Sequence, residues 1–600
     1  MKIKQLDGKI FFAAFKHGAH YVEENKNHLN NINLFPVPDN DTGNNMSLTL
    51  TTTVLKVQPH SSFYKTIRAI ANNSIQAAHG NSGLILAQFF SGFYNKMKNK
   101  EYLTTTDFAE SVKKIVPYIY ENIENPQEGT MITVIKDWAE RLPELAQNID
   151  DFTLLFESSI KTAKKSLINT KNQLEVLKNN KTVDAGAQGF VYFLEGISNY
   201  WQNSKQHDTS EQITTFQTKT PASRENDFKH IALDDLSYRY CTEVLMVSDI
   251  STARVKSLIK NKGDSLIAVS SGSKLRVHIH TDEPEEIIHL LRDKGKIIEQ
   301  KADDMQRQIE SIHHPLSNTA LVTDSIADIP QNLLDKYQIH QIPLNILIDG
   351  VNYLDKKTIS TEYFFEYLNE TEEFPSSSQP NTEFIYQYLL NLADAYDSIL
   401  IISVADEQSG TGQAFRKAKS RVEKIKDIEI SCIDSRLNSG AQGLLVLKAA
   451  EEIARGQKLP ALEQTVKNYR DKTEIYVNVN NFDYMVRGGR INSVMGYLAN
   501  LFNLKPIISL DKQGKGTISG KSISRRGVKR KINKLAEKMK QQKGIEKYAV
   551  VHAQAPELAA EMADNIKNIC GQEPEYIMQI SSIVALNAGP GAVALCLMAG

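Results

Sequence analysis

Two carboxylates stand one residue apart near the start of the chain, directly after the segment Phe-Pro-Val-Pro. They are Asp39 and Asp41, and they precede Thr42, Gly43, Asn44 and Asn45. In an extended or tightly turned segment, residues i and i+2 direct their side chains toward the same point. Paired carboxylates are hard oxygen ligands that suit a magnesium ion carrying phosphate oxygens, and backbone N–H groups at a helix start suit anions. The same spacing also fits a surface turn in which an aspartate caps a helix.

Three further loops of small residues precede apolar stretches in the first 200 residues. The first contains Gly80, Asn81, Ser82 and Gly83, the second Gly129, Thr130 and Met131, and the third Asp184 and Gly186. Each loop alone is typical of an ordinary helix start. Four such loops in one region, one of them with an aspartate pair, predict helix N-termini that converge on one place. That place would be a pocket for a polyphosphate, with Asp39 and Asp41 holding the metal ion.

A cysteine and two histidines form a second set of candidate metal ligands, in the middle of the chain. Cys241 begins one strand-like run, and His278 and His280 end another. Because residues i and i+2 of a strand point to the same face, the two imidazoles project together. A thiolate that joins them completes three ligands that zinc accepts. The alternative is that the histidines are surface residues of a strand and that the cysteine belongs to the core.

The composition is that of a soluble protein with several domains. Six hundred residues exceed what one hydrophobic core can hold, so three or four domains are expected. With a net charge of −1 there is no global basic excess, and nucleic acid is not an expected partner. We find no run of about 18 apolar residues and expect no transmembrane helix. Four scattered cysteines do not suggest a disulfide framework, so a cytoplasmic location is expected.

The apolar pattern changes character along the chain. Residues 1–201 have helical spacing, seen most clearly between Phe152 and Leu167. Residues 202–227 are polar and without period, which indicates a linker. Residues 228–315 mix strand-like runs with helical stretches, which indicates a small α+β domain. From residue 318 onward, short β-rich runs alternate with helical stretches, which predicts an α/β domain with parallel strands.

The four loops of the first region resemble, in this order, the ATP-binding domain shared by the L-subunit of dihydroxyacetone kinase and the bacterial fatty acid kinase. The Phe-Pro-Val-Pro lead-in and the stretch from Gly129 to Ile135 make fatty acid kinase the closer match. The resemblance implies an all-α barrel of antiparallel helices over residues 1–201, with ATP and Mg²⁺ at its loop end. It further implies that Asp39 and Asp41 bind the magnesium ion and that the loop residues named above bind the nucleotide.

The first region departs from the family pattern at a few positions. Asn40 stands where the family usually has glycine, although asparagine tolerates a left-handed backbone. His79 and Ala187 replace an arginine and a glycine. The third metal aspartate of the L-subunit has no carboxylate counterpart, and Asn33 is the nearest candidate. The other ligands of the magnesium ion are therefore not assigned from the sequence.

The middle region is similar to the middle domain of the fatty acid kinase. The matching segments surround Cys241, His278 and His280, and the match ends near Asp303-Asp304-Met305. In that domain the cysteine and both histidines are metal ligands. The resemblance therefore implies a structural zinc site within residues 228–315.

Residues 318–600 resemble the DegV-like fatty-acid-binding proteins. The matching segments begin at Val322, Ser376, Ser409, Asp434, Gly488 and Gly589. The resemblance implies a two-lobed α/β domain that encloses one acyl chain. Carried over by position, Ser377, Ser378 and Ser409 hold the carboxylate, and Arg490 meets the carboxylate or the incoming phosphate. Asn587 stands where the family has a histidine, so this position can form a hydrogen bond but cannot become cationic.

A basic stretch covers residues 521–534. Such a run is typical of a solvated helix face. The alternative is that it steers acidic partners or the phosphates of the kinase module, with Arg525 and Arg526 as the residues that do so.

Together these features predict an ATP-dependent fatty acid kinase with a built-in acyl carrier, acting within one chain or between the two chains of a homodimer. A carboxylate is already a nucleophile at neutral pH, so catalysis rests on positioning and on charge neutralisation by magnesium. The expected product is an acyl phosphate for phospholipid synthesis, with an acyltransferase as partner and transient contact with a membrane surface. Two alternatives stay open: a fatty-acid-binding or regulatory protein with an inactive or weak kinase module, and, less favoured, a glycerone-type kinase.

Overall fold

The computed structural model describes residues 2–97, 99–203, 236–480, 482–489 and 505–600. These residues form two compact units. The first unit comprises Met1–Glu283 and Leu290–Ile309, and the second comprises Pro284–His289 and Glu310–Gly600. Arg490, and the predicted linker from residue 204 onward, lie outside the described residues.

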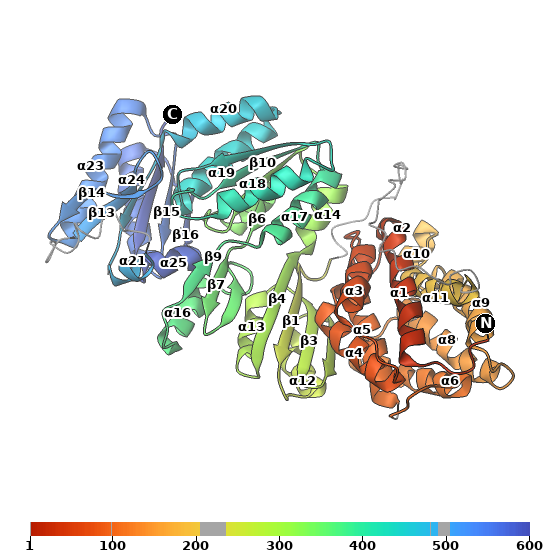
Figure 1. Cartoon of the computed structure of the whole chain (residues 1–600). Helices are drawn as coiled ribbons and strands as arrows, with labels where there is room; N and C mark the ends of the chain where they lie inside the picture. Colours follow the sequence, from red (N-terminus) through yellow and green to blue (C-terminus); the bar gives the residue numbers. More distant parts are fainter. Residues whose placement is uncertain (1, 98, 204–235, 481, 490–504) are drawn as a thin grey trace. The chain divides into compact units, whose positions relative to one another are not determined.

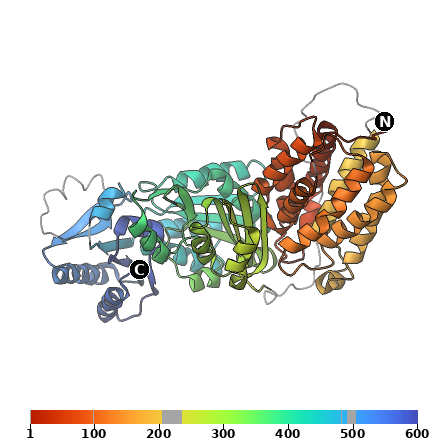
Figure 2. The ribbon, with the colours of Figure 1, turned by 90° about the horizontal axis from the view of Figure 1, so that it is seen from below.

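The first unit begins with a helical domain that contains no extended strand among its described residues up to Asn203. Its helices, drawn in red to orange, pack against one another (Figure 1 and Figure 2), and their buried apolar side chains form a hydrophobic core. Their bounds are α1 Gly8–Glu24, α2 Lys26–Asn31, α3 Thr42–Lys56, α4 Phe63–Ala77, α5 Gly80–Lys96, α6 Thr105–Lys113, α7 Ile115–Asn122, α8 Met131–Ala146, α9 Phe152–Thr170, α10 Glu175–Asn180 and α11 Ala185–Asn203.

Helix α9 illustrates how the sequence pattern builds this core. The apolar residues that recur between Phe152 and Leu167 at steps of three to four are all buried. Its start is fixed by Asp151, whose side chain accepts a hydrogen bond from the Thr153 N–H and so caps the helix. The Phe156 ring meets Trp138 of α8 edge-on at 6.0 Å, a geometry that aromatic quadrupoles favour. The predicted helical character of this region is confirmed.

A four-stranded antiparallel sheet completes the first unit, with strand order β2-β3-β1-β4. The elements of this region are β1 Tyr240–Val247, α12 Thr252–Ile259, a 3₁₀ turn at Lys260–Lys262, β2 Asp264–Ser271, β3 Lys274–Thr281, α13 Pro284–Arg292, β4 Lys296–Asp304 and α14 Met305–His313. The register places Cys241 of β1 directly opposite His280 of β3. The strand-like run predicted to begin at Cys241 lies in β1, and the one predicted to end at His278 and His280 lies in β3.

The sheet packs directly on the helical domain within the first unit. Helices α4 and α5 contact β2. A small core joins the two parts, with Ile75 and Leu84 from the helices and Ile267 and Val269 from the sheet all buried. At its border, Ser271 Oγ donates a hydrogen bond of 2.5 Å to Asn72 Oδ1. The start of α5, which carries one of the predicted nucleotide loops, is thereby held against the sheet.

The second unit begins with a parallel four-stranded sheet in the order β11-β10-β5-β6. A three-stranded antiparallel sheet, β8-β7-β9, follows β6 along the chain. The strands are β5 Thr319–Asp324, β6 His340–Ile342, β7 Asn345–Ile348, β8 Val351–Leu354, β9 Ser376–Ser378, β10 Ser398–Ser403 and β11 Glu429–Asp434. The helices are α15 Gln331–Lys336, α16 Thr361–Glu370, α17 Thr382–Ala395, α18 Thr411–Val422, α19 Ser439–Ala454 and α20 Leu459–Arg470.

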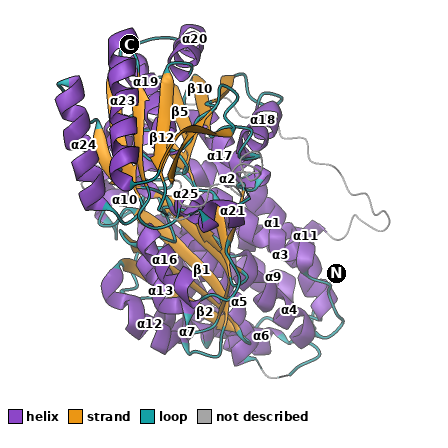
Figure 3. Ribbon diagram, turned by 90° about the vertical axis from the view of Figure 1, so that its left-hand side faces the viewer, coloured by secondary structure: helices purple, strands orange, loops and turns teal. Residues whose placement is uncertain are grey.

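A mixed six-stranded sheet, in the order β14-β13-β12-β17-β15-β16, forms the other lobe of the second unit. Its elements are β12 Thr473–Asn478, α21 Asp483–Arg487, β13 Lys505–Leu510, β14 Gly516–Ser522, α23 Arg525–Lys543, β15 Lys547–His552, α24 Pro556–Cys570, β16 Tyr576–Gln579, α25 Ser582–Ala588 and β17 Val593–Met598. Helices α23 and α24 lie side by side (Figure 3).

The expectation of parallel strands in residues 318–600 is confirmed for the sheet β11-β10-β5-β6. It is wrong for the sheet β8-β7-β9, which is antiparallel, and for the six-stranded sheet. In the six-stranded sheet only β15 and β16 pair in parallel, because the last strand, β17, inserts antiparallel between β12 and β15. The hairpin β13–β14 extends the sheet on the β12 side, again antiparallel. Among the described residues, no helix is long and apolar enough to cross a membrane.

Candidate functional site

The aspartate pair lies in the turn that leads into α3. Asp41 is the N-cap residue of this helix, yet its side chain makes no capping hydrogen bond. Asn40 adopts the left-handed backbone, with φ of 55°, as expected of an asparagine in a glycine position. Asn33 Nδ2 donates to Asp39 Oδ1 at 2.7 Å, and Thr42 Oγ1 donates to Asn33 Oδ1 at 2.9 Å. A buried amide therefore orients the first carboxylate.

The pKa values of both carboxylates are raised, so each holds its proton more tightly than usual. Burial raises the pKa of Asp39 well above its usual range, and the charge of Asp41 adds to the effect. Burial also raises the pKa of Asp41, against the opposing influence of the Lys301 ammonium. Two carboxylates in one pocket favour a divalent cation, which would hold both of them in the ionised form.

The loop at the start of α5 lies directly against the first loop. Gly80 has a φ of 60°, and a Cβ at this position would overlap the Asn45 side chain. A Cβ at Gly83 would likewise overlap Thr49 Oγ1 of α3. The Gly80 N–H donates a hydrogen bond of 2.6 Å to Glu243 Oε1 of β1. Glycine is thus required where the two loops approach, and the sheet holds the second loop.

The loop before α11 joins the same group. A Cβ at Gly186 would lie 3.0 Å from Ser82 Oγ and 3.4 Å from Met131 Cε, so three of the predicted loops meet here. Asp184 Oδ1 accepts a hydrogen bond of 2.7 Å from the Ala187 N–H. Burial raises the pKa of Asp184 to about 7. Gly129 faces elsewhere, against Gln173, and its N–H donates to Thr133 Oγ1.

A small cavity of about 40 Å³ lies at the meeting point of these loops and the sheet. It is lined by Asn33, Pro36, Val37, Asp39, Asp41, Thr42, Asn45, Gly80, Asn81, Ser82, Cys241, His278, His280 and Met305. The lining therefore combines the aspartate pair with all three predicted zinc ligands. Of the predicted nucleotide residues, Gly43, Asn44, Gly83, Gly129, Thr130, Met131, Asp184 and Gly186 do not belong to it.

The cysteine and the two histidines cluster as the strand register requires. The potential ligand atoms of Cys241, His278 and His280 all lie within 4.8 Å of one another. Cys241 Sγ is 3.8 Å from His278 Nδ1, and no described group bonds to the buried His278 Nε2. Burial raises the pKa of Cys241 well above its usual range, so without a cation the sulfur stays a thiol. Two buried imidazoles and a thiol within this span fit one zinc ion.

A buried ion pair that was not predicted from the sequence connects the cluster to the helical domain. Arg276 Nη2 lies 2.6 Å from Glu243 Oε2, and both side chains are only 1% exposed. Burial alone would raise the pKa of Glu243, but Arg276 and His278 hold it well below its usual range. Glu243 follows Cys241 by two residues on β1, so its place on the same face was the available signal.

Lys301 and Asp303 of β4 were also missed. Lys301 pairs in register with Glu243, and its ammonium lies 2.5 Å from Asp303 Oδ2. Burial opposes the charge of Lys301, but the carboxylates of Asp303 and Glu243 raise its pKa well above the usual range. A permanent cation therefore lies close enough to Asp41 to influence its ionisation.

The second unit contains a larger cavity of about 360 Å³ that both lobes line. Ser377, Ser378, Ser409 and Asn587, four of the predicted substrate residues, all contribute to it. Its lining further includes Ile326, Leu344, Gln379, Asp406, Gln408, Gly410, Asn438, Ser439, Ile475, Val477, Met485, Ile508, Ser509, Leu510, Gly516, Val551, His552, Ile580, Ile583, Val584, Ala588, Ala592, Val593 and Ala594.

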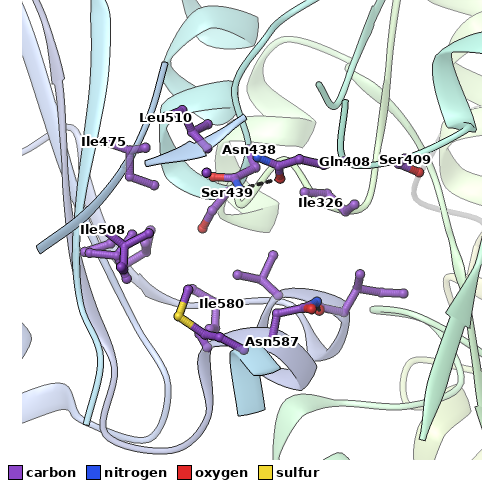
Figure 4. A pocket seen from close by; sticks show the side chains of 18 of the residues that line it. Ile326, Gln408, Ser409, Asn438, Ser439, Ile475, Ile508, Leu510, Ile580 and Asn587 are labelled. Carbon is purple, nitrogen blue, oxygen red and sulfur yellow. Dashed lines mark hydrogen bonds between the residues drawn. The ribbon is translucent and has the colours of Figure 1, made fainter. Parts of the chain in front are cut away.

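Polar and apolar side chains both line this cavity, and Ile326 lies beside Gln408 (Figure 4). Ser409 and Gln408 lie on one side, and Ile475 and Ile508 lie on the other (Figure 4). Gln408 Oε1 accepts a hydrogen bond of 2.8 Å from Asn438 Nδ2. Such an amphipathic cavity suits an apolar chain with a polar head.

Asn587 and Ser409 present oxygen atoms in this cavity. Asn587 Nδ2 donates to the Ile583 carbonyl at 3.0 Å, while no described group donates to its buried Oδ1. A Cβ at Gly488 would overlap this Oδ1, so the chain approaching Arg490 passes close to Asn587. Ser409 Oγ lies 2.8 Å from Thr411 Oγ1, and either hydroxyl can donate.

Two buried aspartates join the lobes next to this cavity. Asp328 Oδ1 accepts from the Ser581 N–H at 2.8 Å, and Asp355 Oδ1 accepts from the Ser582 N–H at 2.9 Å. Lys356 Nζ lies 3.0 Å from Asp328 Oδ1. Burial raises the pKa of Asp355 to about 6. These contacts hold the start of α25, whose residues line the cavity.

Three family models match the chain. Residues 36–199 match the DAK2 domain, and residues 237–312 match the FakA-like middle domain of fatty acid kinase. Residues 318–600 match a model described as an uncharacterised protein of the DegV family.

Sequence relatives match about half of the chain. An uncharacterised protein of Staphylococcus haemolyticus is 31% identical over 316 residues, which cover 51% of this chain and 56% of that protein. Protein YloV of Bacillus subtilis is 30% identical over 325 residues, which cover 52% and 58% of the two chains. The chain thus spans less than two thirds of the length of these relatives.

Two similar solved structures each cover just under half of this chain. DegV from Bacillus subtilis, described as a fatty acid binding protein, is 26% identical, with a TM-score of 0.44 over 47% of this chain and 100% of that chain. A stearic-acid-binding protein from Eubacterium ventriosum is 22% identical, with a TM-score of 0.44 over 47% of this chain and 98% of that chain. By its family matches, the chain joins a DAK2 domain, a FakA-like middle domain and a DegV-family domain in one polypeptide.

Proposed function

We propose that the protein transfers the γ-phosphoryl group of ATP to the carboxylate of a fatty acid held in its DegV domain. One observation carries the proposal: a single chain contains two cavities with complementary chemistry. The first combines a carboxylate pair with glycine-rich helix starts, and the second is lined by apolar side chains together with hydroxyl and amide groups. The first suits a metal ion that carries phosphate oxygens, and the second suits an acyl chain with a polar head.

The magnesium ion would be held by Asp39 and Asp41. The raised pKa values of the two carboxylates support this assignment, because a cation relieves the repulsion that burial intensifies. The ion would neutralise charge on the phosphate oxygens. The backbone N–H groups at the starts of α3 and α5, with Asn45 and Ser82, would hold the phosphates. An antiparallel barrel of the helices, with ATP at its loop end, is part of this proposal.

The acyl chain would lie along the isoleucine side of the larger cavity. Each methylene group buried there contributes about 0.8 kcal/mol to binding. The carboxylate would accept hydrogen bonds from Ser409 and from the serines of β9, Ser377 and Ser378. Asn587 would donate its second Nδ2–H to the same head group, and Arg490 would add a positive charge.

The reaction needs no general base. The fatty acid carboxylate is ionised at neutral pH, so one of its oxygens forms the new bond to the γ-phosphorus. The bond between that phosphorus and the bridging oxygen of ATP breaks, and the leaving group is ADP. The products are ADP and an acyl phosphate. The residues of this chain contribute positioning and charge rather than proton transfer.

The Cys241–His278–His280 cluster would hold a zinc ion. Its ligand set fits zinc, and binding would release the thiol proton of Cys241. The further parts of the proposal are a homodimer in the cytoplasm, transient contact with a membrane surface, and delivery of the acyl phosphate to an acyltransferase of phospholipid synthesis.

The test uses the purified full-length chain. Lipid extracted from it is identified by mass spectrometry, and the chain is then incubated with oleate, ATP and Mg²⁺ in the presence of hydroxylamine, which converts acyl phosphate to a hydroxamate. We expect bound fatty acid and hydroxamate formation. Asp39→Asn and Asp41→Asn should each lower the rate by about 100-fold or more. Asp150→Asn, which removes an exposed carboxylate outside the cavity, is the matched control.

The outcomes separate the proposal from its alternatives. Bound fatty acid without hydroxamate formation would favour the alternative, a binding or regulatory protein without kinase activity. A chain that carries no lipid and does not bind oleate would overturn the acyl part of the proposal. Equal rates of hydroxamate formation for Asp41→Asn and Asp150→Asn would contradict the proposal that Asp39 and Asp41 bind the magnesium ion.

A further inference from the structure

A second cavity of the DegV domain, of about 250 Å³, is not used by the proposed reaction. We call it the basic cavity. It lies between α23, α24 and the β12–β13–β17 region of the six-stranded sheet. Its lining consists of Asn478, Val479, Asn480, Lys505, Arg525, Arg526, Val528, Lys529, Ile532, Leu558, Glu561, Met562, Gly591 and Val593.

The charges around this cavity are strongly unbalanced. Four of the lining side chains are cationic, and Glu561 is the one carboxylate. Glu561 is already engaged with Lys529, at 2.5 Å. Among the described residues, neither Lys505 nor Arg526 has a side-chain hydrogen bond or ion pair. The cavity therefore presents unneutralised positive charge to whatever enters it.

The remaining wall is apolar. Val528 and Ile532 of α23 are fully buried beneath the cavity, and Met562 of α24 packs on the same core. Leu558 of α24 is 41% exposed, although it is a large apolar residue. A ligand with an apolar part would cover Leu558 and remove that surface from water. Charge and apolar surface thus lie in one cavity, which is the arrangement an anionic amphiphile requires.

The first turn of α23 has an unfavourable charge pattern that a bound anion would correct. Arg525 and Arg526 are the first two residues of this helix, and no acidic residue occurs in its first turn. The N-terminus of a helix carries partial positive charge, so cations are disfavoured there and anions are favoured. For Arg526, no described side chain compensates this cost, and such a departure from a local rule is typical of a functional site. Arg525 is already fixed by its hydrogen bond to Asn480 Oδ1, at 2.5 Å.

We propose that the basic cavity binds a phosphomonoester carried on an apolar group. A phosphomonoester is nearly dianionic at neutral pH, which matches the excess of cations better than a singly charged carboxylate. The guanidinium groups of Arg525 and Arg526 offer forked donors for its oxygens. The apolar group lies against Leu558 and Met562. The volume holds a phosphate head and a few carbon atoms, so a longer chain would extend out of the cavity.

The test uses the full-length chain saturated with oleate, so that the acyl cavity is filled. Hexyl phosphate is titrated in a calorimeter, with inorganic phosphate as the comparison. We expect saturable binding of hexyl phosphate and weaker binding of inorganic phosphate. Arg526→Glu should weaken hexyl phosphate binding by about tenfold or more. Arg530→Glu, the same charge change at an exposed residue of α23 outside the cavity, should change it less than about twofold.

A stability measurement separates lost binding from lost folding. Without ligand, Arg526→Glu places a carboxylate at the helix N-terminus and should raise the melting temperature of this unit by about 1 to 3 °C. Weaker binding together with a raised melting temperature supports a site. Equal loss of binding in Arg526→Glu and Arg530→Glu, or equal affinity for inorganic and hexyl phosphate, would overturn the proposal.

The source of the ligand is tested with vesicles. Binding to vesicles that contain phosphatidic acid, lost in Arg526→Glu but retained in Arg530→Glu, identifies a lipid head group. Binding of hexyl phosphate without binding to such vesicles identifies a soluble phosphomonoester. Both results support the site.

Discussion

Replacing Glu243 by glutamine tests how the sheet holds the loop at Gly80. The carboxylate bonds to Arg276 Nη2 and to the Gly80 N–H, each at 2.6 Å, and is 1% exposed. Glutamine keeps the shape and can still accept the Gly80 N–H bond, but it leaves the Arg276 guanidinium buried without its close counter-charge. The next carboxylate, Glu299, is 3.6 Å away and 46% exposed.

The expected cost follows from this geometry. Removing one partner of a buried ion pair costs about 3 to 5 kcal/mol. The retained hydrogen bond and the partial compensation by Glu299 place Glu243→Gln at the lower end, about 3 kcal/mol. For a unit of this size, that cost corresponds to a fall of about 5 °C in melting temperature.

The measurement is differential scanning calorimetry of the full chain, with the affected transition assigned by hydrogen exchange of peptides from β1 and β3. The Gly80 amide should also exchange faster, because its acceptor loses charge. Asp150→Asn, at an exposed ion pair, should leave the transition unchanged.

A double substitution decides whether the ion pair is the cause. Glu243→Leu with Arg276→Met replaces the pair by apolar groups and should recover most of the stability that either single change loses. Losses that simply add in the double variant would refute the reasoning. An unchanged exchange rate at Gly80 in Glu243→Gln would also refute it.

Two further predictions concern other parts of the chain. Gly43→Ala would place a Cβ against the Lys26 carbonyl oxygen, and we expect overpacking to cost about 1 to 3 kcal/mol in urea unfolding of the first unit; a cost within error of zero would contradict this. Asp355 has a pKa raised by burial to about 6, so the folded state holds its proton more tightly than the unfolded state, in which the pKa is about 3.9. The protonated Asp355 therefore stabilises the second unit by about 3 kcal/mol below about pH 4, and this contribution is lost as the pH rises through 6. Asp355→Asn should flatten this part of the pH profile of the second unit, and parallel profiles for the two proteins would contradict it.

Local patterns in the sequence predicted much of the fold. The apolar period between Phe152 and Leu167 predicted α9 and its buried face. The β-rich runs after residue 318 predicted strands of the parallel sheet β11-β10-β5-β6. The antiparallel insertion of β17 was not predictable in this way. Strand pairing depends on which distant segment of the chain forms hydrogen bonds with the exposed edge of a sheet. Local sequence patterns do not contain that information.

The candidate sites show the same division. Their spacing predicted that residues sharing a loop or a strand face, such as Asp39 and Asp41 or His278 and His280, lie close together. Glu243 and Lys301 were not found, because a charged residue in a strand is usually exposed. Only the packing of β1 against β4 and the start of α5 shows that they are enclosed. The role predicted for Arg490 stays a prediction.

The shared carboxylate of Glu243 has a thermodynamic consequence. One of its oxygens accepts from the loop at Gly80, and the same side chain lies 3.5 Å from His278 Nδ1 of the Cys241–His278–His280 cluster. A cation that reorients His278 would change the hydrogen bond that Glu243 accepts from the Gly80 N–H. An anion bound at Gly80 would, through the same carboxylate, change the position of His278. Linkage makes such an effect reciprocal, so each ligand would alter the affinity of the other by the same factor.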